Sequence, residues 1–316
     1  MSGGRPSDDT GSRSRFRSLL AWTALFVGGL LLAALVAPFC YAAFLKLFPG
    51  LSWPFSRIFN RTAMVIAALL LFALRRPLGW SALPALFAGS GSRRKIVQVV
   101  TGVAVALIGA VVAAGAAWAL GRLGPAASSY SFFDGRTVTA LVGGFVVAGI
   151  EETLFRGLML VSLVATVGFR TAAIASSTAY ALVHLLVSDP ALGRAGFNLG
   201  AGFAYLAHAV GRQIELASLL PLCGLFLCGL VLAFVVRRSG TLYIAIGMHA
   251  GWAFSFQVLR HATRPLVAIP GQSYLATHHY LAGTLWAWFG VILSGALALA
   301  WIALLRPDRG GEARGR

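Results

Sequence analysis

The sequence has little charge and very few acidic residues. Only 11% of its 316 residues are charged, whereas soluble domains carry about 25%. Nine residues are acidic and 26 are basic. Hydrophobic residues make up 58% of the chain, and its mean hydropathy is +0.81. This composition excludes an ordinary soluble domain and indicates a polytopic membrane protein.

Cysteine is also scarce. The three cysteines are scattered, in apolar surroundings, at positions 40, 223 and 228. Their number is odd and no pair has the spacing of a zinc site. The sequence therefore excludes a disulfide framework and a cysteine-based zinc module.

The formal net charge of +17 raises the question of nucleic-acid binding. The basic residues cluster at the ends of apolar runs, as membrane topology requires. No soluble domain is present that could hold a nucleic acid. We therefore expect a lipid bilayer as the surroundings and no nucleic-acid partner.

Apolar runs of spanning length, about 17–25 residues, predict an all-α fold with about eight transmembrane helices. The runs cover about residues 19–45, 59–75, 96–121, 137–165, 171–188, 213–236, 241–260 and 283–305. The glycine-rich stretch 190–212 could be an interfacial or re-entrant helix instead of a span.

The simplest partition is a single transmembrane domain over residues 18–306. We expect residues 1–17 to form a disordered basic N-terminus and residues 307–316 to form a short basic tail. With the N-terminus inside, more basic residues fall on the cytoplasmic side, which places both termini in the cytoplasm. The 24 arginines against two lysines hint at a GC-rich bacterial genome, and hence at a bacterial plasma membrane.

Two adjacent carboxylates, Glu151 and Glu152, interrupt the apolar run 137–165. A charge at the centre of a bilayer costs about 2.5–3.5 kcal/mol on insertion scales. On a helix, Glu152 and Arg156 are four residues apart and share a face, so we expect an ion pair. Glu151 points about 100° away from this pair. A partly desolvated carboxylate takes up a proton more readily, which suits general acid–base chemistry.

Two other runs each contain one histidine, His184 and His249. Polar groups in lipid turn toward one another or toward a water-filled cavity. We therefore predict one hydrated site built from Glu151, His184 and His249. The alternative for each histidine is a packing role, with the ring hydrogen-bonded to a backbone carbonyl.

The segment EETLFR (151–156), an aromatic residue four positions before His184, and His249 in a later helix form an ordered pattern. This pattern resembles the CPBP family, the CAAX proteases and bacteriocin-processing enzymes also called the Abi family. Its members are multi-helix intramembrane glutamic endopeptidases, and the eukaryotic type II CAAX prenyl endopeptidase is among them. The resemblance covers about residues 137–260.

The resemblance implies a role for each matching residue. Glu151 is similar to the base that activates water, and His184 to the histidine that holds or polarises that water. His249 resembles a donor to the oxyanion. Glu152 and Arg156 resemble supports of the site. The resemblance implies no cofactor, and zinc held by Glu151, His184 and His249 is the alternative.

One position departs from the family pattern. Members often carry an Asn four residues after the last histidine, and here that position is Ala253. A single oxyanion donor is worth roughly 2.7–4 kcal/mol in other proteases. Backbone N–H groups, Trp252, Ser255 or water could take its place.

These observations favour an intramembrane endopeptidase that hydrolyses a peptide bond of a membrane-associated protein or peptide precursor. A non-catalytic family member acting as a membrane scaffold or immunity protein is one alternative, which the missing Asn keeps open. A proton-coupled transporter is another, although such transporters favour paired halves and the sequence shows no such symmetry. The sequence does not predict the oligomeric state, the cleavage site or whether prenylation matters.

Overall fold

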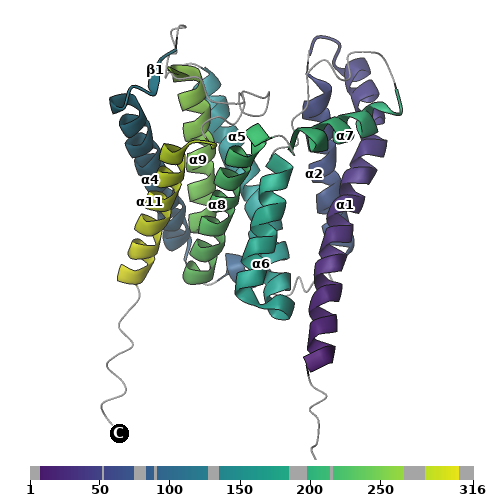
Figure 1. Ribbon diagram of the computed structural model, residues 1–316, viewed down its shortest axis with the longest axis horizontal. Helices are drawn as coiled ribbons and strands as arrows, with labels where there is room; N and C mark the ends of the chain where they lie inside the picture. Colours follow the sequence, from purple (N-terminus) through teal and green to yellow (C-terminus); the bar gives the residue numbers. More distant parts are fainter. Residues whose placement is uncertain are drawn as a thin grey trace, which may run out of the picture. The chain divides into compact units, whose positions relative to one another are not determined.

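A computed structural model describes the fold over residues 8–51, 53–74, 83–88, 91–126, 135–184, 198–213, 216–266 and 282–305. These residues are almost entirely helical (Figure 1). The helices are α1 (Asp8–Leu47), α2 (Phe55–Ala73), α3 (Leu83–Phe87), α4 (Ser92–Ala119), α5 (Gly135–Glu152), α6 (Val161–His184), α7 (Ala201–Gln213), α8 (Leu216–Ser239), α9 (Tyr243–Ala262) and α11 (Leu285–Leu304). A π-helical segment, η2 (Thr153–Leu160), joins α5 to α6. Strands β1 (Leu123–Pro125) and β2 (Thr263–Pro265) form a short antiparallel pair.

Six helical stretches among the described residues are long and apolar enough to cross a membrane. They are Leu19–Leu47, Phe55–Ala73, Ser92–Ala119, Thr137–His184, Ser218–Ser239 and Leu285–Leu304. An all-α polytopic membrane fold therefore fits the structure, and the protein is an integral membrane protein. The predicted number of eight spans is not confirmed.

The difference in number has two physical sources. The stretch Thr137–His184 takes in two predicted runs, and Gly168 lies between them with a non-helical backbone (φ 77°, ψ 165°). The run predicted over residues 241–260 is present as α9 but is not among the six. It contains His249, Gln257 and Arg260, which lower its hydropathy.

Two further expectations meet the structure only in part. α1 begins at Asp8, inside the stretch predicted to be disordered. Within the stretch 190–212, α7 has 13 residues and is about 20 Å long. That length is too short for a bilayer core of about 30 Å and fits the interfacial interpretation. Residues 1–7, 190–197 and 307–316 lie outside the described part of the chain.

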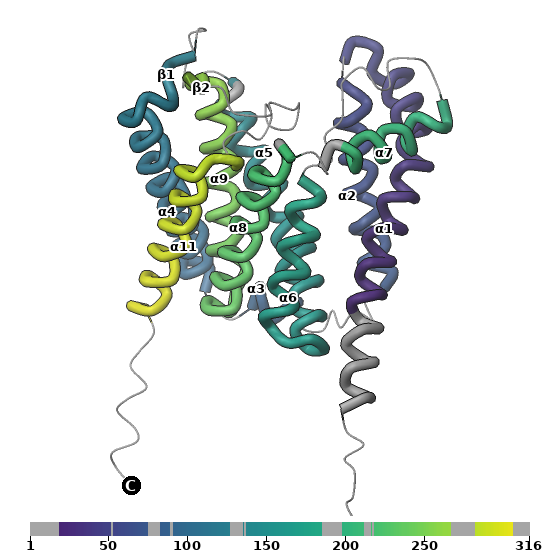
Figure 2. Tube along the Cα trace, in the orientation of Figure 1, coloured from purple at the N-terminus to yellow at the C-terminus, as the bar shows by residue number. Residues whose placement is uncertain are grey.

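The chain divides into two compact units, each assembled from separated stretches of sequence. The colours of Figure 2 allow these stretches to be followed along the chain. The first unit comprises Met1–Pro84, Gly157–Gly229 and Ile269–Gly283. The second unit comprises Ala85–Arg156, Leu230–Ala268 and Thr284–Arg316. The single domain over residues 18–306 stays a prediction.

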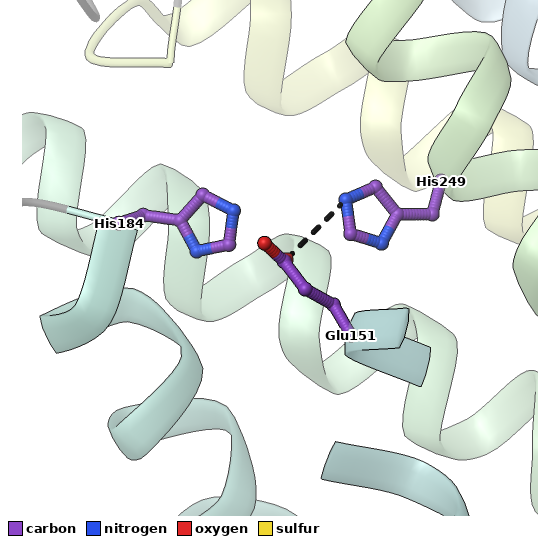
Figure 3. A group of neighbouring side chains, drawn as sticks. All are labelled: Glu151, His184 and His249. Carbon is purple, nitrogen blue, oxygen red and sulfur yellow. Dashed lines mark ion pairs between the residues drawn. The ribbon is translucent and has the colours of Figure 1, made fainter. Parts of the chain in front are cut away.

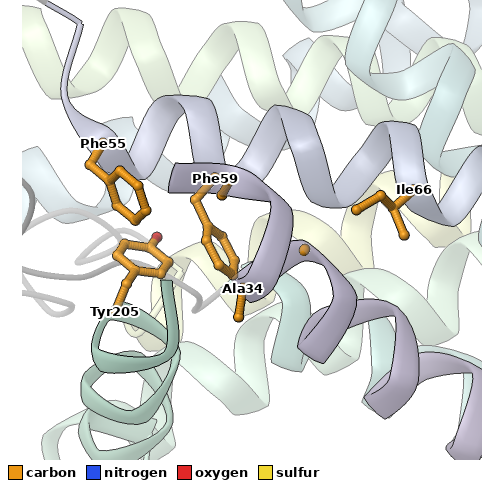
Figure 4. Packing of buried hydrophobic residues seen from close by; sticks show 7 residues of the cluster. Ala34, Phe55, Phe59, Ile66 and Tyr205 are labelled. Carbon is orange, nitrogen blue, oxygen red and sulfur yellow. The ribbon is translucent and has the colours of Figure 1, made fainter. Parts of the chain in front are cut away.

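Aromatic side chains form the core of the first unit, where α1, α2 and α7 meet (Figure 4). The ring of Tyr205 on α7 lies 4.4 Å from that of Phe59 and 5.7 Å from that of Phe55, both on α2. α7 also lies directly on α1, since a Cβ on Gly202 would overlap the backbone of Ala34. Aromatic stacking and a glycine contact thus hold the short α7 against the longer helices.

In the second unit, α9 packs against both α4 and α5, and α11 packs against α4. The contact between α4 and α9 is close enough to exclude side chains. A Cβ on Gly102 would overlap the carbonyl oxygen of Ile244, and one on Gly247 would overlap that of Val99. Small residues at such contacts let helices in a membrane approach closely. This packing places α9, which carries His249, within the unit.

Gly247→Ala tests this close contact. The added methyl group meets the backbone of α4, which cannot rotate away, so we expect a destabilisation of about 1–3 kcal/mol. Gly143→Ala is the matched control, because a Cβ on Gly143 meets nothing within 4 Å and alanine favours the helix. The measurement is the midpoint of thermal unfolding in detergent. Equal midpoints for the two variants would contradict the packing described.

Candidate active site

The candidate site begins where α5 changes into a π-helix. Glu151 and Glu152 are the last two residues of α5, and the chain continues as η2. π-helical turns are rare and occur frequently at functional sites. Because a π-helical turn is wider, the side chains after Glu152 are displaced from the positions that a regular α-helix would give them. The sequence pattern predicts a continuous α-helix here and does not reveal this change.

Glu152 and Arg156 form the predicted ion pair. Nη1 of Arg156 lies 2.8 Å from Oε1 of Glu152, and neither side chain is exposed to solvent. A buried ion needs both a counter-charge and hydrogen bonds. The pair therefore persists across the start of the π-helix and lowers the cost of burying both charges.

Glu152 also binds a histidine from another helix. Nδ1 of His249, on α9, lies 2.8 Å from the same Oε1 of Glu152. An ionised carboxylate only accepts hydrogen bonds, so Nδ1 of His249 is the donor. The ring is buried, with 4% of its residue surface exposed. The other ring nitrogen, Nε2, then faces away from Glu152.

Nε2 of His249 faces Glu151. It lies 3.7 Å from Oε2 of Glu151 (Figure 3), beyond the usual range of a direct hydrogen bond. The Glu151 side chain is 13% exposed, whereas that of Glu152 is 0% exposed. The two neighbouring carboxylates therefore differ: Glu152 is enclosed by Arg156 and His249, whereas Glu151 is partly exposed.

Close packing of α5 on α9 makes this arrangement possible. Gly144 of α5 lies against α9, where a Cβ on it would be 3.2 Å from the carbonyl oxygen of Ala250. The absence of a side chain at Gly144 lets α5 lie close to α9, and Glu152, further along α5, reaches His249. The sequence placed Glu152 and Arg156 on one face but gave no sign that Glu152 would also bind His249.

His184 is the last residue of α6 and belongs to the first unit. Its Nδ1 lies 2.9 Å from the carbonyl oxygen of Tyr180, and the two rings are 4.1 Å apart. Because a carbonyl only accepts, Nδ1 donates, and Nε2 is the acceptor nitrogen of the neutral ring. Glu151 and His249 belong to the second unit, so a site shared by all three residues stays a prediction.

The position of the missing Asn is turned toward α5. The Cβ of Ala253 is 3.7 Å from the point that a Cβ on Gly144 would occupy. Two residues considered as substitute donors bind elsewhere. Nε1 of Trp252 donates to Ser294 over 3.3 Å, and the hydroxyl of Ser255 donates to the carbonyl of Gly251 over 2.7 Å.

Comparison with known proteins gives one match. Residues 133–255 match the family described as "Type II CAAX prenyl endopeptidase Rce1-like", which confirms the predicted resemblance over this segment. No curated protein and no solved structure matches the chain. The matched segment contains Glu151, Glu152, Arg156, His184 and His249. The family is one of peptidases, which supports hydrolysis of a peptide substrate at the level of the family.

Arg156→Ala tests the buried pair. Its loss leaves Glu152 with an uncompensated buried charge, so we expect a destabilisation of about 3–5 kcal/mol. The double variant Glu152→Ala/Arg156→Ala removes both charges and should be less destabilised than Arg156→Ala. Arg170→Ala is the control, since Arg170 is exposed. Thermal unfolding in detergent measures all three. Equal melting temperatures for Arg156→Ala and Arg170→Ala would show that Arg156 does not belong to a buried ion pair.

Proposed function

We propose that the protein is an intramembrane glutamic endopeptidase in which Glu151 activates the attacking water. One observation carries the proposal: two neighbouring carboxylates in an apolar helix have different surroundings. Glu152 is enclosed and bound by Arg156 and His249. Glu151 is partly exposed and faces the Nε2 side of His249. A general base must contact water, and of the two carboxylates Glu151 is the one with exposed surface.

The proposed reaction conserves atoms and protons. Glu151 takes one proton from a water molecule, and the resulting hydroxide attacks the carbonyl carbon of the scissile peptide. A tetrahedral oxyanion forms. The carbon–nitrogen bond then breaks, and the leaving amine receives the proton from Glu151. The carboxylate is thereby regenerated for the next cycle.

His249 is the proposed donor to the oxyanion. Since Nδ1–H is held by Glu152, Nε2 can donate only when the ring carries both protons. In that state the charges of Glu151, Glu152, Arg156 and His249 sum to zero. A neutral cluster is less costly to bury than a charged one. Glu152 thus acts as a positioning residue, because it orients the ring and balances its charge.

His184 is the proposed second partner of the water. This role follows from the family pattern. It is supported by the hydrogen bond to Tyr180, which leaves Nε2 as the acceptor nitrogen. The water could then donate one proton toward Glu151 and one toward His184. With Ala253 in place of the family Asn, a backbone N–H or a water is the remaining source of a further oxyanion donor.

The same two hydrogen bonds also suit a metallopeptidase. Histidines that ligate a metal almost always donate their other ring N–H to a carboxylate or a backbone carbonyl. His249 donates to Glu152 and His184 to Tyr180. Glu151, His184 and His249 have the residue types that hold zinc, which would polarise the water. Metal content therefore has to be measured together with activity.

We propose a membrane-anchored protein or peptide precursor as the substrate. A leader peptide or a C-terminal sorting tail fits a bacterial plasma membrane better than a prenylated protein does. We further propose that both termini face the cytoplasm. A scaffold or immunity role is the alternative that the absent Asn supports, and it predicts no dependence on Glu151.

Glu151→Gln is the decisive substitution. It keeps the size of the side chain and removes the base, so we expect uncleaved precursor to accumulate in membrane and secreted fractions compared by proteomics. His249→Ala should have the same effect. In purified protein, cleavage should fall by at least 100-fold while thermal unfolding changes little, because glutamine keeps the size and polarity of the side chain. Full cleavage by the purified Glu151→Gln protein would end this assignment.

Metal analysis of the same preparations separates the two mechanisms. For a glutamic peptidase we expect less than stoichiometric zinc in the active protein and activity that survives chelators. One zinc per chain that is lost together with activity on chelation would show that the mechanism is that of a metallopeptidase.

A further inference from the structure

Five basic residues gather at one end of the second unit. Arg93, Arg94 and Lys95 lie in the first turn of α4, and Arg237 and Arg238 lie in the last turn of α8. All except the half-buried Lys95 are exposed. We call these five residues the basic rim. Cations are disfavoured at the start of a helix because the helix dipole is positive there, so folding of α4 alone does not explain the first three.

Hydrogen bonds hold the two parts of the rim together. The turn that follows α8 reaches α4, where the hydroxyl of Thr241 donates to Oε1 of Gln98 over 2.9 Å. Ser239 accepts from the backbone N–H of Thr241 over 3.3 Å. Nζ of Lys95 lies 5.4 Å from the ring centroid of Tyr243, at the start of α9. The turn that follows Arg237 and Arg238 is therefore joined to α4 close to its basic first turn.

Exposed apolar side chains begin immediately beside the rim. On α4, Ile96 is 63% exposed and Val100 is 59% exposed. On α8, Phe234 is 46% exposed and lies one turn before Arg238. In a membrane protein these apolar surfaces face acyl chains. A molecule that satisfies both surfaces needs a negative headgroup and hydrocarbon tails.

We propose that the basic rim binds an anionic phospholipid. Its headgroup lies among the basic side chains of α4 and α8, and its acyl chains lie along the exposed apolar residues of α4. A soluble anion would satisfy the charge but not the apolar surface. A neutral phospholipid would match the apolar surface but not the positive charge of the rim. The proposal does not depend on the proposed peptidase activity.

The test compares phosphatidylglycerol with phosphatidylcholine of identical acyl chains. Each lipid is titrated into the full-length protein in detergent, and bound lipid is counted by native mass spectrometry. We expect phosphatidylglycerol to bind at least fivefold more tightly. Arg93→Gln/Arg94→Gln should weaken the binding of phosphatidylglycerol by at least fivefold, since one basic residue near an anionic surface contributes about that factor to the affinity. Phosphatidylcholine binding should not change.

Arg122→Gln/Arg264→Gln is the matched control. Both arginines are exposed. Arg122 lies just before β1 and Arg264 lies in β2, beyond the C-terminal ends of α4 and α9. This variant loses the same charge and should bind phosphatidylglycerol like the wild type. An equal loss of phosphatidylglycerol binding in both double variants would show an effect of net charge alone and would overturn the proposal. Equal binding of the two lipids by the wild type, or displacement by soluble glycerophosphoglycerol, would overturn it as well.

Discussion

The buried carboxylate of Glu152 is the interaction on which the candidate site depends. A charge in an apolar interior must be matched by counter-charges and hydrogen bonds. Glu152 meets this requirement with two partners, Arg156 from the following π-helical turn and His249 from α9. It therefore joins the end of α5 to α9 and fixes which nitrogen of His249 faces Glu151. Removal of any partner leaves the others inside the protein with unmatched polar atoms.

Small residues make this polar arrangement sterically possible. Gly102 and Gly247 let α4 and α9 meet backbone to backbone, and Gly144 lets α5 approach α9 near Ala253. The same small residues also leave fewer side chains that could take part in the chemistry. The family Asn is absent where α9 faces α5, and Trp252 and Ser255 donate to other groups. In the proposed mechanism, a backbone N–H or a water therefore completes the oxyanion site.

Much of this organisation follows from the sequence, and the reasons for the rest are physical. Hydropathy predicted the helices, and helical periodicity predicted the pair of Glu152 with Arg156. It could not predict that α9 supplies a second partner for Glu152, because a contact between helices depends on packing that a single helix does not encode. The π-helix after Glu152 and the break at Gly168 are backbone departures without a hydropathy signal. The predicted eight spans stay unconfirmed, because α9 carries the site residue His249 and other polar side chains that lower its hydropathy.

The protonation of His249 tests the account most directly. Histidine labelled with ¹⁵N in the purified protein reports whether each ring nitrogen carries a proton, and a His249→Ala sample assigns the resonances. Because the ionised carboxylate of Glu152 only accepts, Nδ1 of His249 should carry a proton at neutral pH in the folded protein. A His249 ring with a bare Nδ1 and its proton on Nε2 would contradict the account, since Glu152 could then not hold the ring toward Glu151.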